Sequence, residues 1–484
     1  MILSSVGVTA YPYCLWIKSL GLSDLEQLLQ DIAGDRGRRS LFFEGPMSDF
    51  EILSEGRTTR AGQPHLEIQK IVEKVGDAIT SFAHKASEKQ NKTVQLTSFE
   101  GANLPTPLLS VWTSRLSTLT ILSVRDGSVL TAEVAESIHQ NCPFFRELTC
   151  YHIQGSHVDQ NMSEFFRGLR DDSLQNFRVV STNEMGPRAL EGLMNHARSL
   201  RSLTLSSLGT TSLPFLHLLT SLQYLEELNI EASTTSPPST WAPEGEDPLP
   251  MLTIWLKGCR SLKQLSISKL AGGSKLLSDV LVSPDLRLRK LDVRLVDDDE
   301  AFYSALGHQV DLETLVFRSY AETTDQNGVR HDKFLDSICA CRKLRHINII
   351  QDIELGIDQV QLTTEDLFLI RKALRNLEEL SFEGENLTDA IFEPLAHITS
   401  LKAVYISGLS LFTYDGIKFF IEALQAAGTH DGFRLEIASQ HGDAKIPVRL
   451  EKKLARLVNS SLNGYFSLVY FRDLSEDDTP PDSD

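Results

Sequence analysis

The sequence has little of several things, and each shortage excludes a class of protein. Six cysteines among 484 residues, with no Cys-x-x-Cys pair, are too few for a disulfide framework or a zinc ribbon, so we expect a reducing compartment, the cytoplasm or the nucleus. Lys and Arg number 47 against 65 Asp and Glu, a net charge of −18 that disfavours general nucleic-acid binding. No uninterrupted apolar run approaches the roughly 18 residues of a membrane helix, and no basic segment precedes an apolar one in Met1–Cys14. We therefore expect neither a membrane partner nor a secretory signal.

Motifs that carry catalysis or bind cofactors are also missing. The sequence contains no G-x-S-x-G, H-E-x-x-H, G-x-x-x-x-G-K-[ST] or strand-following G-x-G-x-x-G. Its histidines and cysteines are scattered and lack the spacing of metal ligands. We expect no catalytic, cofactor-binding or metal-binding residues and no cofactor. An enzyme with an unrecognised site built from loops is a less favoured alternative.

What the sequence does contain is one short apolar string, repeated many times. The pattern L-x-x-L-x-L, with other apolar residues allowed, recurs from Leu119 to Leu401 at a mean spacing of about 28 residues, which is typical of leucine-rich repeats. The copies begin at Leu119, Phe145, Leu174, Leu200, Leu225, Leu262, Leu288, Leu312, Leu344, Leu377 and Leu401.

Amphipathic segments lie between these strings. Val134, Ala135 and Ile138, for example, are spaced to share one face of a helix. Each unit is therefore expected to be a short strand followed by a helix, and neither can bury its apolar face without the next copy. The predicted fold class is α/β, a leucine-rich-repeat solenoid or horseshoe with a parallel inner sheet and outer helices.

The expected organisation has three parts. Residues 1–100 are predicted to form an atypical N-terminal cap with irregular opening repeats at Leu20–Leu22, Leu41–Phe43 and Val94–Leu96, and a first helix that begins with a capping box at Ser23–Glu26. Residues 101–474 are the solenoid, with a proline-rich loop insertion at 233–250. Residues 475–484 are expected to be an acidic disordered tail.

Several fragments resemble a known family. Cys259-x-x-Leu262-x-x-Leu265 and Cys341-x-x-Leu344-x-x-Ile347 look like cysteine-containing leucine-rich repeats, and Tyr13–Leu22, Leu25–Leu29 and Leu41–Pro46 resemble the segment that follows the F-box in a large set of fungal proteins. The chain is thus similar to leucine-rich-repeat proteins of the F-box type. The resemblance implies a substrate receptor that binds the Skp adaptor of a cullin ubiquitin ligase. An F-box itself is not recognisable: Leu22–Ile32 resembles only its start, so the implied role requires an F-box supplied by another segment or chain.

The candidate site is the inner wall of the solenoid. Side chains alternate along a strand, so if the leucines face the core, the residues between them line this wall. A basic cluster is expected at Lys290, Arg294 and Arg318, and an acidic one at Glu379 and Glu383. The candidate partner-binding residues are Arg178, Glu227, Asn229, Lys290, Asp292, Arg294, Arg318, His346, Glu379, Glu383 and Tyr405.

These residues predict a non-catalytic module that binds a protein partner on its concave face. The basic cluster is suited to an acidic or phosphorylated segment. The competing interpretation is an ordinary solvated strand face, neutralised by Asp292. A stand-alone scaffold or an inhibitor is the alternative function.

Overall fold

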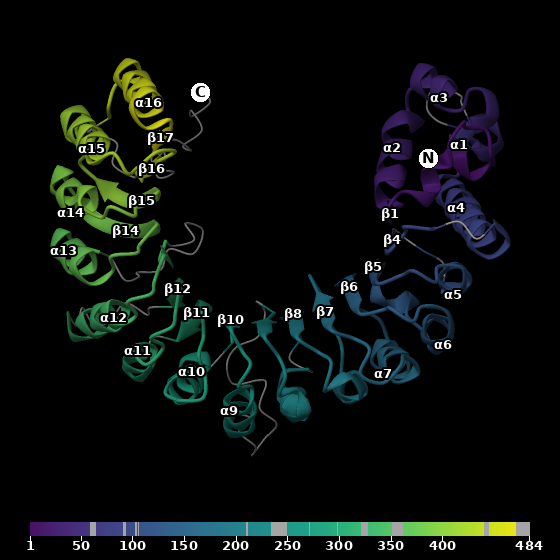
Figure 1. The fold of residues 1–484 in the computed structure, drawn as a ribbon, viewed down its shortest axis with the longest axis horizontal. Coiled ribbons are helices and arrows are strands. Elements are labelled where there is room, and N and C mark those ends of the chain that lie inside the picture. The colour runs from purple at the N-terminus through teal and green to yellow at the C-terminus, as the bar shows by residue number, and fades with distance from the viewer. Residues whose placement is uncertain are drawn as a thin grey trace, which may run out of the picture. The chain divides into compact units, whose positions relative to one another are not determined.

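The chain forms two compact units, Met1–Cys259 and Arg260–Asp484, each built from alternating strands and helices (Figure 1). The computed structural model describes residues 1–58, 64–90, 93–101, 104, 106–209, 212–233, 249–270, 272–297, 299–320, 328–350, 362–439 and 445–470. None of the described helices combines the length and the apolar character needed to cross a membrane.

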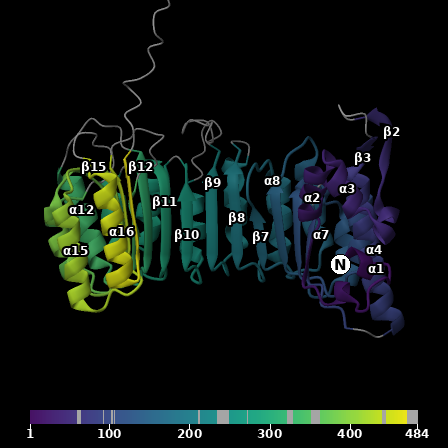
Figure 2. The ribbon, with the colours of Figure 1, turned by 90° about the horizontal axis from the view of Figure 1, so that it is seen from above.

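Unit 1 contains a parallel sheet whose strands follow chain order. The strands are β1 (Ser19–Gly21), β4 (Ser98–Gly101), β5 (Ile121–Asp126), β6 (Glu147–His152), β7 (Asn176–Val179), β8 (Ser202–Leu208) and β9 (Glu227–Ala232). In Figure 2 the strands β7, β8 and β9 stand side by side. One row of in-register core residues crosses this sheet: Phe99, Leu122, Leu148, Phe177, Leu203 and Leu228.

The helices of unit 1 close the apolar side of the sheet. They are α1 (Ile2–Ser5), α2 (Ser23–Ala33), α3 (Arg36–Phe42), α4 (Ile68–Gln90), α5 (Thr106–Ser114), α6 (Ala132–Asn141), α7 (Val158–Gly168), α8 (Pro187–Leu193) and α9 (Leu249–Gly258). Successive helices pack on one another, as α7 does on α8 and α5 on α6. Each helix and strand thus buries its apolar face against the neighbouring copy, as the sequence predicts.

The N-terminal segment departs from the repeat. An antiparallel pair, β2 (Leu53–Thr58) and β3 (Pro64–Leu66), lies outside the main sheet. The first helix is confirmed as α2, but the predicted capping box at its start is wrong. Leu22 occupies the N-cap position, and the Ser23 hydroxyl donates a hydrogen bond to Glu100 Oε1 at 3.2 Å instead. Of the predicted opening strings, Leu20 lies in β1 and Leu96 precedes β4. The prediction at Leu41–Phe43 is wrong, because Leu41 and Phe42 end helix α3 and Phe43 is its C-cap.

Unit 2 repeats the same plan. Its strands are β10 (Gln264–Ser268), β11 (Lys290–Asp297), β12 (Thr314–Tyr320), β13 (His346–Asn348), β14 (Glu379–Leu387), β15 (Ala403–Ser410), β16 (Arg434–Ser439) and β17 (Tyr465–Tyr470), all paired in parallel. Its helices are α10 (Gly273–Leu281), α11 (Glu300–Leu306), α12 (Gly328–Ala340), α13 (Thr364–Ala373), α14 (Phe392–Ala396), α15 (Tyr414–Ala427) and α16 (Val448–Leu462). Figure 1 shows these helices on one side of the strands. The predicted α/β leucine-rich-repeat fold, with a parallel sheet and outer helices, is confirmed in each unit.

A buried thiol recurs at one position of the repeat, just before the strand. Cys142 Sγ lies 3.4 Å from the carbonyl oxygen of Leu116, and Cys259 Sγ lies 3.2 Å from that of Leu222. Cys341 makes the same contact with Leu306. In each case the thiol donates to a carbonyl oxygen of the preceding repeat. A buried carbonyl oxygen needs such a hydrogen-bond donor.

Other repeats place a different donor at this position. Gln309 is buried; its amide nitrogen donates to the carbonyl of Leu281 at 2.6 Å, and its amide oxygen accepts from the backbone N–H of Leu288 at 3.0 Å. The buried rings of His196 and His430 lie six and four residues before their strands rather than five, and they hydrogen-bond the carbonyls of Phe166 and Leu401 in the preceding repeats. The position therefore joins consecutive repeats through a polar contact inside the core.

Two predicted segments lie largely or wholly outside the described residues. These are the loop insertion at 233–250, of which only 233 and the first residues of α9 are described, and the tail at 475–484.

Candidate protein-interaction surface

The sheet side that faces away from the helices is called here the open face of each unit. In unit 1 its side chains form rows because the strands are in register. One row contains Glu147, Asn176, Ser202 and Glu227, and the next contains Thr149, Arg178, Thr204 and Asn229. The core residues between these rows are buried, as the alternation along each strand predicts.

A shallow hollow of about 370 Å³ lies on the open face of unit 1. Glu147, Asn176, Arg178 and Glu227 line it together with their strand neighbours. The Ser202 hydroxyl donates to Glu227 Oε2 at 3.2 Å, which holds one wall of the hollow in place. Two of the predicted site residues, Arg178 and Glu227, are thus brought to one place.

Arg201 is a half-buried cation that lines this hollow, and Arg178 is its exposed cation. Within the described part of the chain its guanidinium makes no hydrogen bond or ion pair. Its register neighbours on β6 and β8 are Thr149 and Thr204, which are uncharged. Asn229, the third predicted residue of unit 1, is half-buried on β9 beside Thr204.

The three basic residues predicted on the open face of unit 2 divide into two groups. Lys290 is exposed at the start of β11, whereas Arg294 lies four residues further along the same strand, beside Arg318 of β12. Asp292 is only 7% exposed, and its carboxylate accepts two hydrogen bonds from Arg294, from Nε at 2.7 Å and from an Nη atom at 2.8 Å. Asp292 therefore orients Arg294 and offsets part of its charge, as the solvated-face interpretation predicts.

The remaining predicted residues of unit 2 lie on β13, β14 and β15. His346 and Glu379 are direct register neighbours, with 3.2 Å between Nδ1 and Oε2. Tyr405 and Glu383 are half-buried, with Tyr405 beside Ser381 and Glu383 beside Ser407. The open face of unit 2 thus changes from basic at β11 and β12 to acidic at β14.

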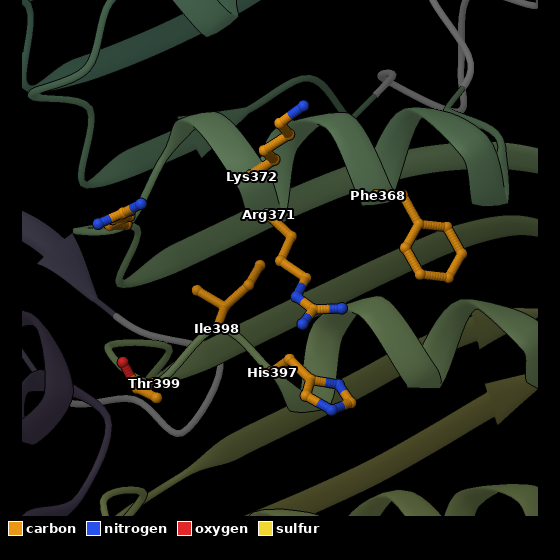
Figure 3. A pocket seen from close by; sticks show the side chains of 7 residues that line it. Phe368, Arg371, Lys372, His397, Ile398 and Thr399 are labelled. Carbon is orange, nitrogen blue, oxygen red and sulfur yellow. The ribbon is translucent and has the colours of Figure 1, made fainter.

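Sequence reasoning missed a second charged surface, on the helix side of unit 2. Arg371, Lys372 and Arg375 lie at the C-terminal end of α13 and line a hollow of about 550 Å³ with His397. Figure 3 shows the Arg371 side chain reaching toward His397 while Lys372 points away from it. The run Arg371-Lys372-x-x-Arg375 is visible in the sequence. The prediction of the site considered only residues on strands, and these three residues lie at the end of a helix.

The buried thiols of the core are held in their protonated form. Burial raises the pKa of the Cys142, Cys259 and Cys341 thiols to about 12, far above neutrality. Among the residues that the structure describes, no three His, Cys, Asp or Glu side chains gather closely enough to hold a metal ion.

Comparisons with known proteins add a likeness of fold. No protein-family model matches the chain, and no curated protein matches it. Among solved structures it is similar to a complex of TLR13 with ssRNA13, at a TM-score of 0.37 and 13% identity over 81% of this chain and 52% of that one. It is also similar to the complex of Rad7 and Elc1 in yeast, at a TM-score of 0.42 and 16% identity over 70% and 85%. The chain spans about half the length of the TLR13 chain.

Proposed function

We propose that this chain is a non-catalytic protein-recognition module that binds a protein partner on the open face of its sheet. The observation that carries the proposal is the hollow around Arg178, whose exposed guanidinium lies on a rigid strand without a charged partner among the described residues. An Arg fork held in this way is suited to a carboxylate of a partner protein.

The other side chains of the open face also favour the binding of a protein partner. Its polar side chains project from paired strands, so little backbone conformational entropy is lost when a partner binds. Arg294 is already oriented by Asp292, and His346 by Glu379. The proposed partner-binding residues are Arg178, Glu227 and Asn229 in unit 1, and Lys290, Asp292, Arg294, Arg318, His346, Glu379, Glu383 and Tyr405 in unit 2.

The test compares two charge reversals in the full chain. Arg178→Glu changes the open face, and Arg167→Glu makes the same change on helix α7, where Arg167 pairs with Glu191 at the surface. Affinity capture with mass spectrometry should recover a partner with the wild type and with Arg167→Glu, and should lose it with Arg178→Glu. Retention of every partner by Arg178→Glu would remove the Arg178 hollow as the binding site.

The resemblance to F-box-type proteins leads to a narrower proposal, that the partner is a substrate destined for ubiquitin transfer through the Skp adaptor. A pull-down of the full chain with purified Skp adaptor tests it. Binding would support the substrate-receptor role. Absence of binding, with partner capture retained, would leave the stand-alone scaffold or inhibitor.

A further inference from the structure

The helix side of unit 2 carries a compact group of cations that the open face does not explain. Arg371, Lys372 and Arg375 extend from the last turn of α13 and the residues after it, and Arg342 follows the end of α12. Within the described residues these four side chains make no hydrogen bond or ion pair. We call these four residues the α13 basic surface.

Two hollows make this surface continuous. One, of about 550 Å³, is lined by Arg371, Lys372, Arg375 and His397 (Figure 3). The other, of about 700 Å³, is lined by Arg342, Lys372 and Arg375. Because Lys372 and Arg375 border both hollows, the basic surface extends from the end of α12 across α13 to the end of α14.

The surface also has an apolar component. Phe368 is 39% exposed and borders the first hollow; Leu369 is 50% exposed and borders the second. Asp336 lines the second hollow, and the two hollows together are lined by four Arg or Lys side chains. The local charge is therefore positive on a chain whose net charge is −18.

We infer that the α13 basic surface is a docking site for an acidic polypeptide segment that carries several carboxylates and an apolar side chain. Charge complementarity selects a negative partner, and the spread of the cations over two hollows suits a row of carboxylates better than a single phosphate. The exposed Phe368 and Leu369 offer contacts to an apolar side chain. A nucleic acid is disfavoured because its unbroken phosphate chain would extend past this surface onto the acidic remainder of the protein, which a short acidic segment does not reach.

The experiment measures binding of a fluorescein-labelled ten-residue peptide of eight Glu and Asp residues and two Phe residues by the full chain. The test variant is Arg371→Glu/Lys372→Glu/Arg375→Glu. The matched control is Lys452→Glu/Lys453→Glu/Arg456→Glu, which places the same three charge reversals at the same spacing on the exposed side of α16. We expect the test variant to weaken binding at least about tenfold and the control to change it less than about twofold.

Further variants and ligands distinguish local recognition of carboxylates from a general effect of charge or of misfolding. The milder Arg371→Gln/Lys372→Gln/Arg375→Gln variant should also weaken binding, and circular dichroism verifies that each variant is folded. The inference is overturned if the wild type does not bind the peptide, if both triple reversals weaken binding equally, or if a single-stranded oligonucleotide or a phosphoserine peptide of equal charge binds while the carboxylate peptide does not.

Discussion

At the scale of single residues, burial controls the chemistry of the cysteines. It raises the pKa of Cys339, the half-buried thiol, to about 11, and those of Cys142, Cys259 and Cys341 to about 12. Because the thiolate is the reactive form, native thiols should react at least about 100-fold more slowly with Ellman's reagent at pH 8 than the same thiols in guanidinium chloride. Cys339→Ser should remove the fastest native phase. Rapid native labelling of several thiols would contradict the burial described here.

One buried ion pair gives the protein a defined pH dependence. His331 of α12 hydrogen-bonds Asp366 of α13 at 2.9 Å between Nε2 and Oδ2. This hydrogen bond raises the pKa of His331 despite its partial burial. Burial by itself would raise the pKa of Asp366, but hydrogen bonds from His331 and Thr363 lower it below its usual value. The pair therefore links two consecutive helices while both groups are charged.

The two pKa shifts determine how the contribution of this pair to the free energy of unfolding changes with pH. The His331 contribution is fully present below the ordinary pKa of about 6.5 and is lost as the pH rises through the raised folded value. The Asp366 contribution is present above its ordinary pKa and is lost as the pH falls through the lowered folded value. His331→Gln should thus reduce the free energy of unfolding by about 1 kcal/mol at pH 5.5 and by less at pH 8.5. Urea denaturation of the wild type and the variant at both pH values measures this, and an equal loss at the two pH values would contradict it.

At the scale of the elements, the hydrogen-bonding side chains before β6, β10, β12 and β13 hold consecutive repeats together. Gln309→Leu should lower the free energy of unfolding by about 2–4 kcal/mol, because it leaves the buried Leu281 carbonyl and Leu288 N–H without partners. The adjacent exposed His308→Leu serves as the control and should change stability by less than about 0.5 kcal/mol. Equal effects of the two substitutions in urea denaturation would show that these hydrogen bonds do not support the repeat.

The strands from β5 to β15 were predictable because a full apolar string overlaps each of them, beginning two residues before the strand. The strands β16 and β17 were missed because the first leucine position is occupied by Gly432 and Asn463, whose positive φ angles of 76° and 49° turn the chain into the strand. In β4 the last apolar position is Gly101, and the Leu104 side chain fills the space where a Cβ would lie. Backbone geometry thus replaces the expected side chain before β16 and β17, and the Leu104 side chain replaces it in β4.

Part of the candidate interaction surface was also predictable from the sequence. Alternation along the strands placed Arg178 and Glu227 on one face, and the structure brings them to one hollow. The separation of Lys290 from Arg294 along β11 was also implicit in strand length. The α13 basic surface was not found, because it joins the ends of successive helices and depends on how far each helix extends before the next strand. That length varies from repeat to repeat and is not fixed by the apolar string.

At the scale of the whole molecule, a repeat fold distributes its stability over neighbouring contacts. Leu148 of β6 and Leu380 of β14 are buried core residues of different units, whereas Leu380 and Val404 are register neighbours on β14 and β15. Each Leu→Ala change should lower the free energy of unfolding by about 2–5 kcal/mol. The sequence predicts repeats but not how strongly distant ones are coupled, so the coupling has to be measured.

A pair of double-mutant cycles measures it. Leu148→Ala and Leu380→Ala should be additive within about 0.5 kcal/mol, because in a solenoid each repeat contacts only its neighbours. Leu380→Ala with Val404→Ala should deviate from additivity by about 0.5–3 kcal/mol, because the two side chains share one part of the core. Urea denaturation of the full chain gives the free energies for both cycles. Strong coupling between Leu148 and Leu380 would mean that the two units share a single cooperative core, and stability could then no longer be treated as a sum over neighbouring repeats.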